Sequence, residues 1–345
     1  MVSKGRCVCP VLPPQSAGYF DTPIKIIENH VSYWYSSKVC RQQQGAYPTA
    51  GEKVIKGSFI NTPRGFFHYH RLGQTGKQIH FCHGSSLSAG TYLPFLEDLA
   101  EEGFRVVASD LRGHGFSTKD QTAKIESWQI FIKDMAALVA SITKPPVIGM
   151  GHSIGGYFTY AAAALYPHLF SRLVLIDPII FPPMVVWAAA LLRKTGLSGR
   201  LKLAQMARNK KAEFGSRQEA LAHYKGKGMF ASWQQASVEA FVATAVEQDT
   251  TDTYSLCCLP EFEAQIYEHV PFDTWSHAAK IKVPVMVVRG ETSDLFFRGA
   301  GRRLEKKITD CRFVELDGMG HFMMMENPGR VVKTVRPFLA SIAAD

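Results

Sequence analysis

A sharp turn between a strand and a helix constrains this sequence more than any other feature. An apolar run at 146–150 predicts a buried strand, and an alanine-rich run at 154–165 predicts a helix. Between them stands a Gly-His-Ser-Ile-Gly motif centred on Ser153, which is G-x-S-x-G in its proper setting. Such a turn leaves room only for small residues two positions before and after the serine, which accounts for Gly151 and Gly155. The pattern predicts that Ser153 is a nucleophile held above a sheet edge.

Strands and helices alternate on both sides of this motif, which predicts a parallel sheet covered by helices on both faces. The expected strands are 53–60, 65–72, 78–82, 104–109, 146–150, 173–176, 283–288 and 312–316. The alternation stops between 181 and 274, where the sequence is helical in character. We therefore expect an irregular N-terminal extension at 1–50, a core formed by 51–180 and 275–345, and a helical cap at 181–274.

A serine nucleophile needs a base, and the base needs an acid that orients it. His321 follows the last expected strand in a glycine-rich loop, so it is the predicted base. The order serine, acid, histidine along the chain favours Asp294, which follows the strand 283–288. Asp177, which follows the strand 173–176, is a second candidate for the acid, and Glu291 is a weaker third.

Backbone N–H groups near Ser153 are expected to stabilise the oxyanion of a tetrahedral intermediate. The N–H of Ile154 stands at the start of a helix, and Gly84 allows the N–H of Ser85 to turn toward the serine. Apolar and aromatic residues of the cap and of the two motif loops are the predicted substrate contacts. They are Trp187, Met229, Phe230, Trp233, His152 and Phe322.

Five segments together resemble the α/β-hydrolase fold serine hydrolases. These segments are His83-Gly84, Asp110–Ser117, Gly151–Gly156, Gly290–Asp294 and Gly320-His321. The resemblance implies an α/β architecture with an eight-stranded, mostly parallel sheet, helices on both faces, an inserted helical cap and no cofactor. It also implies an esterase, lactonase or C–C bond hydrolase. Related epoxide hydrolases and haloalkane dehalogenases need an aspartate where this chain has Ser153, so they are disfavoured.

The expected activity is cleavage of a carboxylic ester of a small or medium apolar substrate through an acyl-enzyme. C–C bond hydrolysis, lactone hydrolysis and acyl transfer with the same triad stay open. A ligand receptor that keeps the fold without turnover is an alternative of another class.

Residues 193–227 of the cap hold ten basic and two acidic side chains, a local excess of eight in a chain whose net charge is +9. The excess predicts either solvated helix faces or a basic surface that attracts an anionic small molecule or an acidic membrane. No nucleic-acid-binding motif accompanies it. The seven cysteines lack zinc-ligand spacing, so no metal is expected. The N-terminus lacks the apolar run of a signal peptide, and no apolar stretch is long enough to span a membrane, which favours a cytoplasmic protein.

Overall fold

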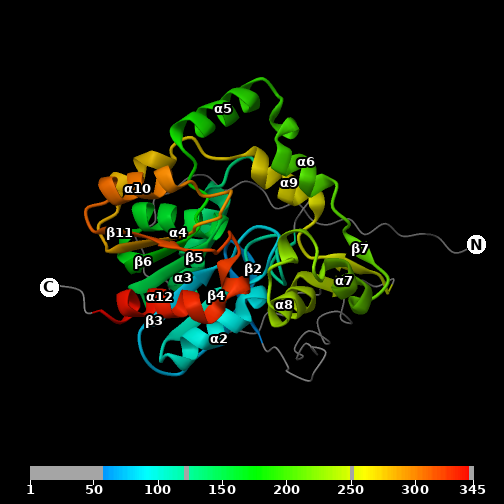
Figure 1. Ribbon diagram of the computed structural model, residues 1–345, viewed down its shortest axis with the longest axis horizontal. Coiled ribbons are helices and arrows are strands. Elements are labelled where there is room, and N and C mark those ends of the chain that lie inside the picture. Colours follow the sequence, from blue (N-terminus) through cyan, green and yellow to red (C-terminus); the bar gives the residue numbers. More distant parts are fainter. Residues whose placement is uncertain (1–56, 120–123, 249–251, 342–345) are drawn as a thin grey trace, which may run out of the picture. The chain divides into compact units, whose positions relative to one another are not determined.

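The computed structural model describes residues 57–119, 124–248 and 252–341, so the expected extension at 1–50 lies outside the described residues. Eight strands form one sheet in the order β1-β2-β4-β3-β5-β6-β10-β11 (Figure 1). Their bounds are Ser58–Thr62 (β1), Gly65–Leu72 (β2), Gln78–Cys82 (β3), Arg105–Ser109 (β4), Val147–His152 (β5), Phe170–Ile176 (β6), Val285–Gly290 (β10) and Cys311–Leu316 (β11). Strand β2 is antiparallel to β1 and β4, and the remaining pairs are parallel.

Helices of the core follow these strands along the chain, while a second group lies between β6 and β10. The core helices are Leu93–Glu101 (α2), Gln129–Ile142 (α3), Ile154–Leu165 (α4), Arg298–Lys307 (α10), Met323–Glu326 (α11) and Pro328–Ala340 (α12). The second group is Pro183–Lys194 (α5), Lys202–Arg208 (α6), Arg217–Tyr224 (α7), Gln235–Ala245 (α8) and Pro260–Glu268 (α9). Six short 3-10 turns complete the described part: Ala89–Tyr92, Pro167–Leu169, Ser198–Arg200, Gly228–Phe230, Thr274–Ser276 and Ala278–Lys280. Within the described residues, no helix has both the length and the apolar character needed to cross a bilayer.

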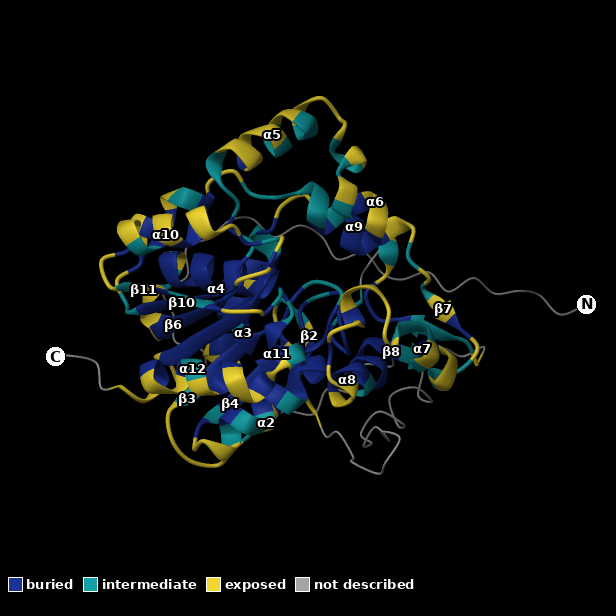
Figure 2. Cartoon of the chain, in the orientation of Figure 1, coloured by how far each residue is buried: buried dark blue, intermediate teal, exposed yellow. Residues whose placement is uncertain are grey.

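The two faces of the sheet bury alternate residues of each central strand. In β6, Val174 and Ile176 pack on the face covered by α2 and α12, whereas Leu173 and Leu175 pack against α3, α4 and α10. Strands buried on both faces read as continuous apolar runs, as expected for a parallel sheet between helix layers. Figure 2 shows this as a continuous buried interior through the strands and α4, in contrast to the exposed helix α5.

The predicted fold is confirmed, because the eight-stranded, mostly parallel sheet carries helices on both faces. The segment expected to be a helical cap differs in one respect: it also holds a small antiparallel sheet in the order β7-β9-β8. Its strands are Glu213–Phe214 (β7), Val246–Gln248 (β8) and Tyr254–Leu256 (β9). Strands of two or three residues are too short to show an alternating pattern in the sequence.

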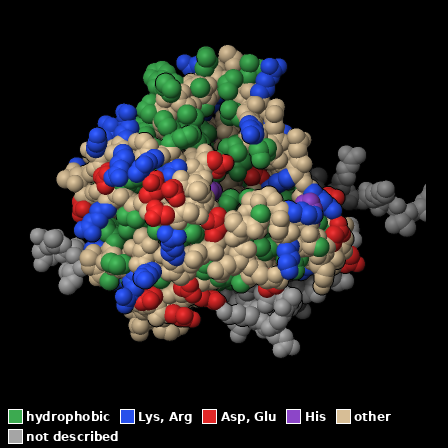
Figure 3. Space-filling model, viewed as in Figure 1, with side chains coloured by type: hydrophobic (Ala, Val, Ile, Leu, Met, Phe, Trp, Pro, Cys, Tyr) green, Lys and Arg blue, Asp and Glu red, His purple; other side chains and the backbone are tan. Residues whose placement is uncertain are grey.

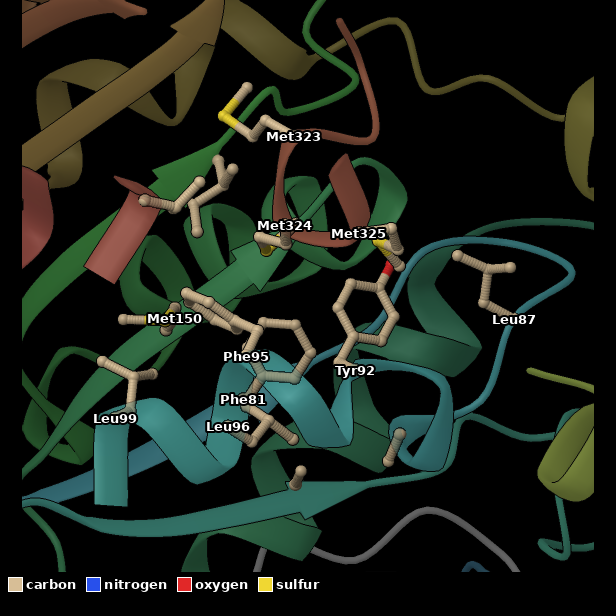
Figure 4. Close-up of a cluster of buried hydrophobic side chains, with 14 of the residues drawn as sticks. Phe81, Leu87, Tyr92, Phe95, Leu96, Leu99, Met150, Met323, Met324 and Met325 are labelled. Atoms are coloured by element: carbon tan, nitrogen blue, oxygen red, sulfur yellow. The ribbon is translucent and has the colours of Figure 1, made fainter. Parts of the chain in front are cut away.

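One apolar cluster lies directly behind the His321 loop. Figure 4 shows Met324 and Met325 of α11 close to Tyr92 and Met323 further from it; these three methionines, Tyr92 and Phe81 of β3 belong to one cluster and are almost fully buried. Thioether side chains adapt to irregular gaps, so this run fills the space between α2 and the sheet. The packing fixes α11 and, with it, the position of His321 just before it.

Candidate active site

Ser153 occupies a strained turn between β5 and α4. Its backbone has φ 56° and ψ −123°, a combination that residues other than glycine rarely adopt. A Cβ atom at Gly155 would stand 2.3 Å from the carbonyl oxygen of Cys82, and one at Gly151 would stand 2.4 Å from that of Gly155. The two glycines therefore allow the turn to press against the end of β3, as the sequence predicts.

Ser153, His321 and Asp177 form one hydrogen-bonded line at the carboxyl ends of the strands. The Ser153 hydroxyl lies 3.1 Å from His321 Nε2, and His321 Nδ1 lies 2.5 Å from Asp177 Oδ2. An Nδ1–H that donates to the carboxylate leaves Nε2 free to accept the serine proton. All three side chains are buried. This arrangement can activate the hydroxyl and stabilise the imidazolium that forms when the proton moves.

The acid in this line corrects the sequence-based prediction. Asp294 was the expected partner of His321, but it is exposed, and the structure places the carboxylate of Asp177 there instead. Glu291 also points elsewhere, since its Oε2 accepts a hydrogen bond from the Gly318 N–H at 2.7 Å. Strand β6 lies between β5 and β10, so Asp177 is one strand from the nucleophile strand, whereas Asp294 follows a strand two positions away.

The loop after β10 supports Asp177 rather than supplying a second carboxylate. The Ser293 hydroxyl donates to Asp177 Oδ2 at 2.5 Å, and the Gly290 N–H donates to Oδ1 at 3.2 Å. Gly290 also permits the His321 loop to cross closely, because a Cβ atom there would lie 2.3 Å from the Gly320 carbonyl oxygen. Sequence reasoning missed Ser293, whose only signal was its place beside Asp294.

The backbone around Gly84 approaches the serine closely. A Cβ atom at Gly84 would stand 3.3 Å from Ser153 Cβ, so the peptide leading to Ser85 runs beside the nucleophile. Ile154 is the first residue of α4, where N–H groups lack helical partners and the helix dipole favours negative charge. Of the two predicted oxyanion donors, Ile154 thus follows Ser153 directly in the chain, and Ser85 follows the Gly84 backbone that lies beside Ser153.

A chain of side-chain hydrogen bonds joins this glycine loop to the His321 loop. The Tyr92 hydroxyl accepts from the Gly84 N–H at 2.9 Å and lies 2.7 Å from His152 Nδ1. His152 Nε2 lies 2.9 Å from the His321 carbonyl oxygen and must donate to it, so Nδ1 accepts the tyrosine proton. Both nitrogens of the buried His152 ring are therefore engaged by protein. His152, predicted as a substrate contact, thus bridges the two loops through its ring nitrogens, and sequence reasoning missed Tyr92.

Burial holds the histidines behind the site in the neutral form. Burial, followed by the nearby charge of His321, lowers the pKa of His152 well below its usual value. Burial also lowers the pKa of His80, on β3, to about 4. Asp110 lies in the same interior; burial alone would raise the pKa of its carboxyl, but the hydrogen bond from His68 and the nearby histidines hold that pKa well below its usual range.

Aromatic rings form a continuous row from His321 into the cap. Ring centroids are 4.8 Å apart between His321 and Phe322, 5.3 Å between Phe322 and Trp233, and 4.5 Å between Trp233 and Phe230. The three predicted substrate contacts Phe230, Trp233 and Phe322 are thus brought together beside His321. Met229 is partly exposed next to Phe230. Trp187 is different: its side chain is 76% exposed on α5.

Basic residues of the cap are partly neutralised by acids that lie further along the chain. Lys210 pairs with the buried Glu263 of α9 and donates to the Ser86 hydroxyl at 2.6 Å. Arg208 pairs with Glu261 and Glu268 of the same helix. The cap charge is therefore not all free surface charge, and Lys210 ties the cap to the loop that carries Ser85. Among the described residues, no cluster of histidine, cysteine, aspartate and glutamate is arranged to hold a metal ion.

Comparison with known proteins agrees with this fold. A model described as "Alpha/beta hydrolase family" matches residues 81–334. A serine hydrolase-like protein of Danio rerio is 25% identical over 280 residues, which cover 78% of this chain and 83% of the relative. A solved E-2-(acetamidomethylene)succinate hydrolase covers 83% of this chain and 99% of its own, with a TM-score of 0.67 and 20% identity. An enol-lactonase from Burkholderia xenovorans covers 82% and 100%, with a TM-score of 0.58 and 22% identity.

Proposed function

Because the chain belongs to the alpha/beta hydrolase family, we propose that it hydrolyses a carboxylic ester of a small or medium apolar substrate through an acyl-enzyme. The observation that carries this proposal is the hydrogen-bonded line from Ser153 through His321 to Asp177. An oxygen nucleophile hydrogen-bonded to an imidazole suits attack on an acyl carbon. The aromatic row beside His321 supplies an apolar wall for the acyl or alkyl group.

Each group has one role in the proposed reaction. Ser153 Oγ attacks the ester carbonyl carbon while its proton passes to His321 Nε2, and Asp177 stabilises the imidazolium. The Ser85 and Ile154 N–H groups bind the oxyanion that develops on the carbonyl oxygen. The C–O bond then breaks, and the leaving alkoxide takes the proton from His321. A water molecule then gives a proton to the same nitrogen and attacks the acyl carbon. The bond to Ser153 Oγ breaks, this oxygen takes the proton back from His321, and the carboxylic acid is released.

The test is turnover of p-nitrophenyl esters of increasing acyl length by the wild type and by Ser153→Ala. We expect the variant to lose at least about a thousandfold in kcat, because it lacks the nucleophile. Ser141→Ala removes an exposed hydroxyl at the end of α3 and is the matched control, with unchanged kcat. Equal activity of the Ser153→Ala variant and the wild type would overturn the proposal.

Other substrates, supplied to the same two proteins, distinguish the competing activities. Lactones, β-diketones and an added alcohol acceptor report lactonase, C–C hydrolase and acyltransferase activity respectively, and we expect each to be poorer than ester hydrolysis by water. A receptor without turnover would release at most one equivalent of p-nitrophenol per Ser153. Release of many equivalents therefore distinguishes the enzyme from a receptor.

A further inference from the structure

Helix α5 presents its apolar side to solvent. Met184, Trp187 and Leu191 follow at i, i+3 and i+7, and their side chains are 83%, 76% and 64% exposed. The opposite side turns inward: Val186 is the one buried residue of this helix, and Arg193 lies with its guanidinium carbon 3.7 Å from the centre of the Phe272 ring. A helix on a globular protein normally has the reverse arrangement, with its apolar stripe toward the core.

The chain around this stripe is basic throughout. From Pro178 to Ala212 there is no acidic residue, and seven are basic. Lys194, Arg200 and Lys202 are exposed just beyond the apolar stripe. Figure 3 shows the apolar side chains gathered over α5 with lysine and arginine side chains at both sides of them, and Figure 1 shows that α5 stands apart from the central sheet. An apolar ridge bordered by positive charge is typical of helices that lie in the headgroup layer of a membrane.

We infer that α5 is a docking surface for lipid bilayers that carry anionic headgroups. Met184, Trp187 and Leu191 enter the boundary between headgroups and acyl chains, while Lys194, Arg200 and Lys202 stay at the level of the lipid phosphates. A second copy of the chain is a poorer occupant of this surface. A two-fold interface places the same patch against itself, so it would bring the exposed Lys194, Arg200 and Lys202 toward the same three residues of the other copy.

The experiment measures sedimentation of the Ser153→Ala protein with sucrose-loaded vesicles. This variant cannot use its proposed nucleophile, so the vesicles stay intact and the result is independent of the proposed hydrolase activity. Vesicles of two parts phosphatidylcholine to one part phosphatidylglycerol are compared with pure phosphatidylcholine. We expect binding to the first to be stronger by at least about tenfold and to weaken with added salt.

Two sets of variants separate the apolar contribution to vesicle binding from the electrostatic one. Trp187→Gln is expected to weaken vesicle binding at least about tenfold, because it removes one large apolar side chain that the bilayer would bury. The combined Lys194→Gln, Arg200→Gln and Lys202→Gln variant loses about fivefold per charge, but only with anionic vesicles. The matched controls are Phe66→Gln, which removes another exposed aromatic ring at the far edge of the sheet, and Lys133→Gln with Lys144→Gln and Lys333→Gln.

The inference is upheld if the α5 variants lose binding, retain the circular dichroism of the parent, and the controls bind as the parent does. It is overturned if the parent does not sediment with anionic vesicles, or if the controls lose as much binding as the α5 variants. A particle of twice the monomer mass in gel filtration that Trp187→Gln converts to monomer would assign the surface to a second copy, and would also overturn it.

Discussion

The loops around Ser153 and the helix α5 differ in how far their side chains are buried and hydrogen-bonded. Around Ser153 almost everything is buried and partnered: Asp177 accepts from His321, Ser293 and Gly290, and both nitrogens of His152 are engaged. On α5 the largest apolar side chains face solvent. A substitution around Ser153 breaks a hydrogen bond or a close contact, whereas a substitution of an exposed side chain on α5 does not. The comparison suggests that the core determines the reaction and the cap determines which surface or substrate the site meets.

The largest expected effect comes from replacing Asp177, the buried acid of the Ser153 region. Asp177→Asn should reduce kcat by about ten-thousandfold, because an uncharged amide cannot stabilise the imidazolium or hold the required tautomer. Asp294→Asn, the same change on the exposed neighbour, should leave kcat within about twofold. Ester turnover of the two purified variants gives the comparison. A greater loss in the Asp294 variant would restore the acid expected from the sequence.

A smaller effect tests how tightly the core region is built. Gly155→Ala should lower the free energy of unfolding by about 3 kcal/mol, because its Cβ would collide with backbone oxygens that cannot move away easily. Gly299→Ala is the control: it has open space in α10, so the change should stabilise the helix by about 0.5–1 kcal/mol. Urea unfolding measures both. Equal stability of the Gly155 variant and the wild type would mean that this turn is looser than described.

Buried neutral histidines make the same region sensitive to acid. The pKa of His80 in the folded protein is about 4, below its ordinary value of 6.5, so the unfolded chain binds a proton first as the pH falls. Stability is therefore full above pH 6.5 and is lost between 6.5 and about 4, by about 2 kcal/mol at roughly pH 5 for this one group.

Unfolding of His80→Gln at about pH 7 and about pH 5 checks this contribution. The variant should lose about 2 kcal/mol less than the wild type between the two conditions. His168→Gln, at an exposed position, should follow the wild type. An unchanged pH dependence in the His80 variant would show that its ring is not held neutral.

The smallest expected effect tests whether the Tyr92 hydroxyl positions the active-site loops or only stabilises the fold. Tyr92→Phe removes the group that joins Gly84 to His152, so we expect about a tenfold loss in kcat with KM within about twofold. Tyr160→Phe deletes another buried hydroxyl, which donates to the Thr274 carbonyl oxygen at 3.0 Å, away from the site. Both variants should lose similar stability, but only the first should lose kcat. Equal kcat values in the two variants would reduce Tyr92 to a packing residue.

The sheet and the positions of Ser153 and His321 at its edge could be predicted from the sequence, because each carries a local signal. The glycines around Ser153 and the glycine-rich loop before His321 are required by backbone geometry, and the apolar runs report burial on both faces of a parallel sheet. These signals depend only on residues close together in the chain.

The acid could not be identified in the same way, because Asp177 and Asp294 both follow buried strands. The choice between them depends on the loop after β10, which turns Ser293 inward and Asp294 outward. Tyr92 was missed for a related reason, since its two partners lie 8 and 60 residues away. The outward-facing stripe on α5 was also hidden, because the periodicity of a helix shows that a stripe exists but not which side is buried.

The most direct test of the central claim is covalent labelling with a fluorophosphonate, which reacts with an activated serine. We predict one equivalent of label per chain, located by peptide mass spectrometry on Ser153, with labelling abolished in Ser153→Ala and at least about a thousandfold slower in His321→Ala. Labelling of a different serine, or an equal rate in the His321 variant, would contradict it.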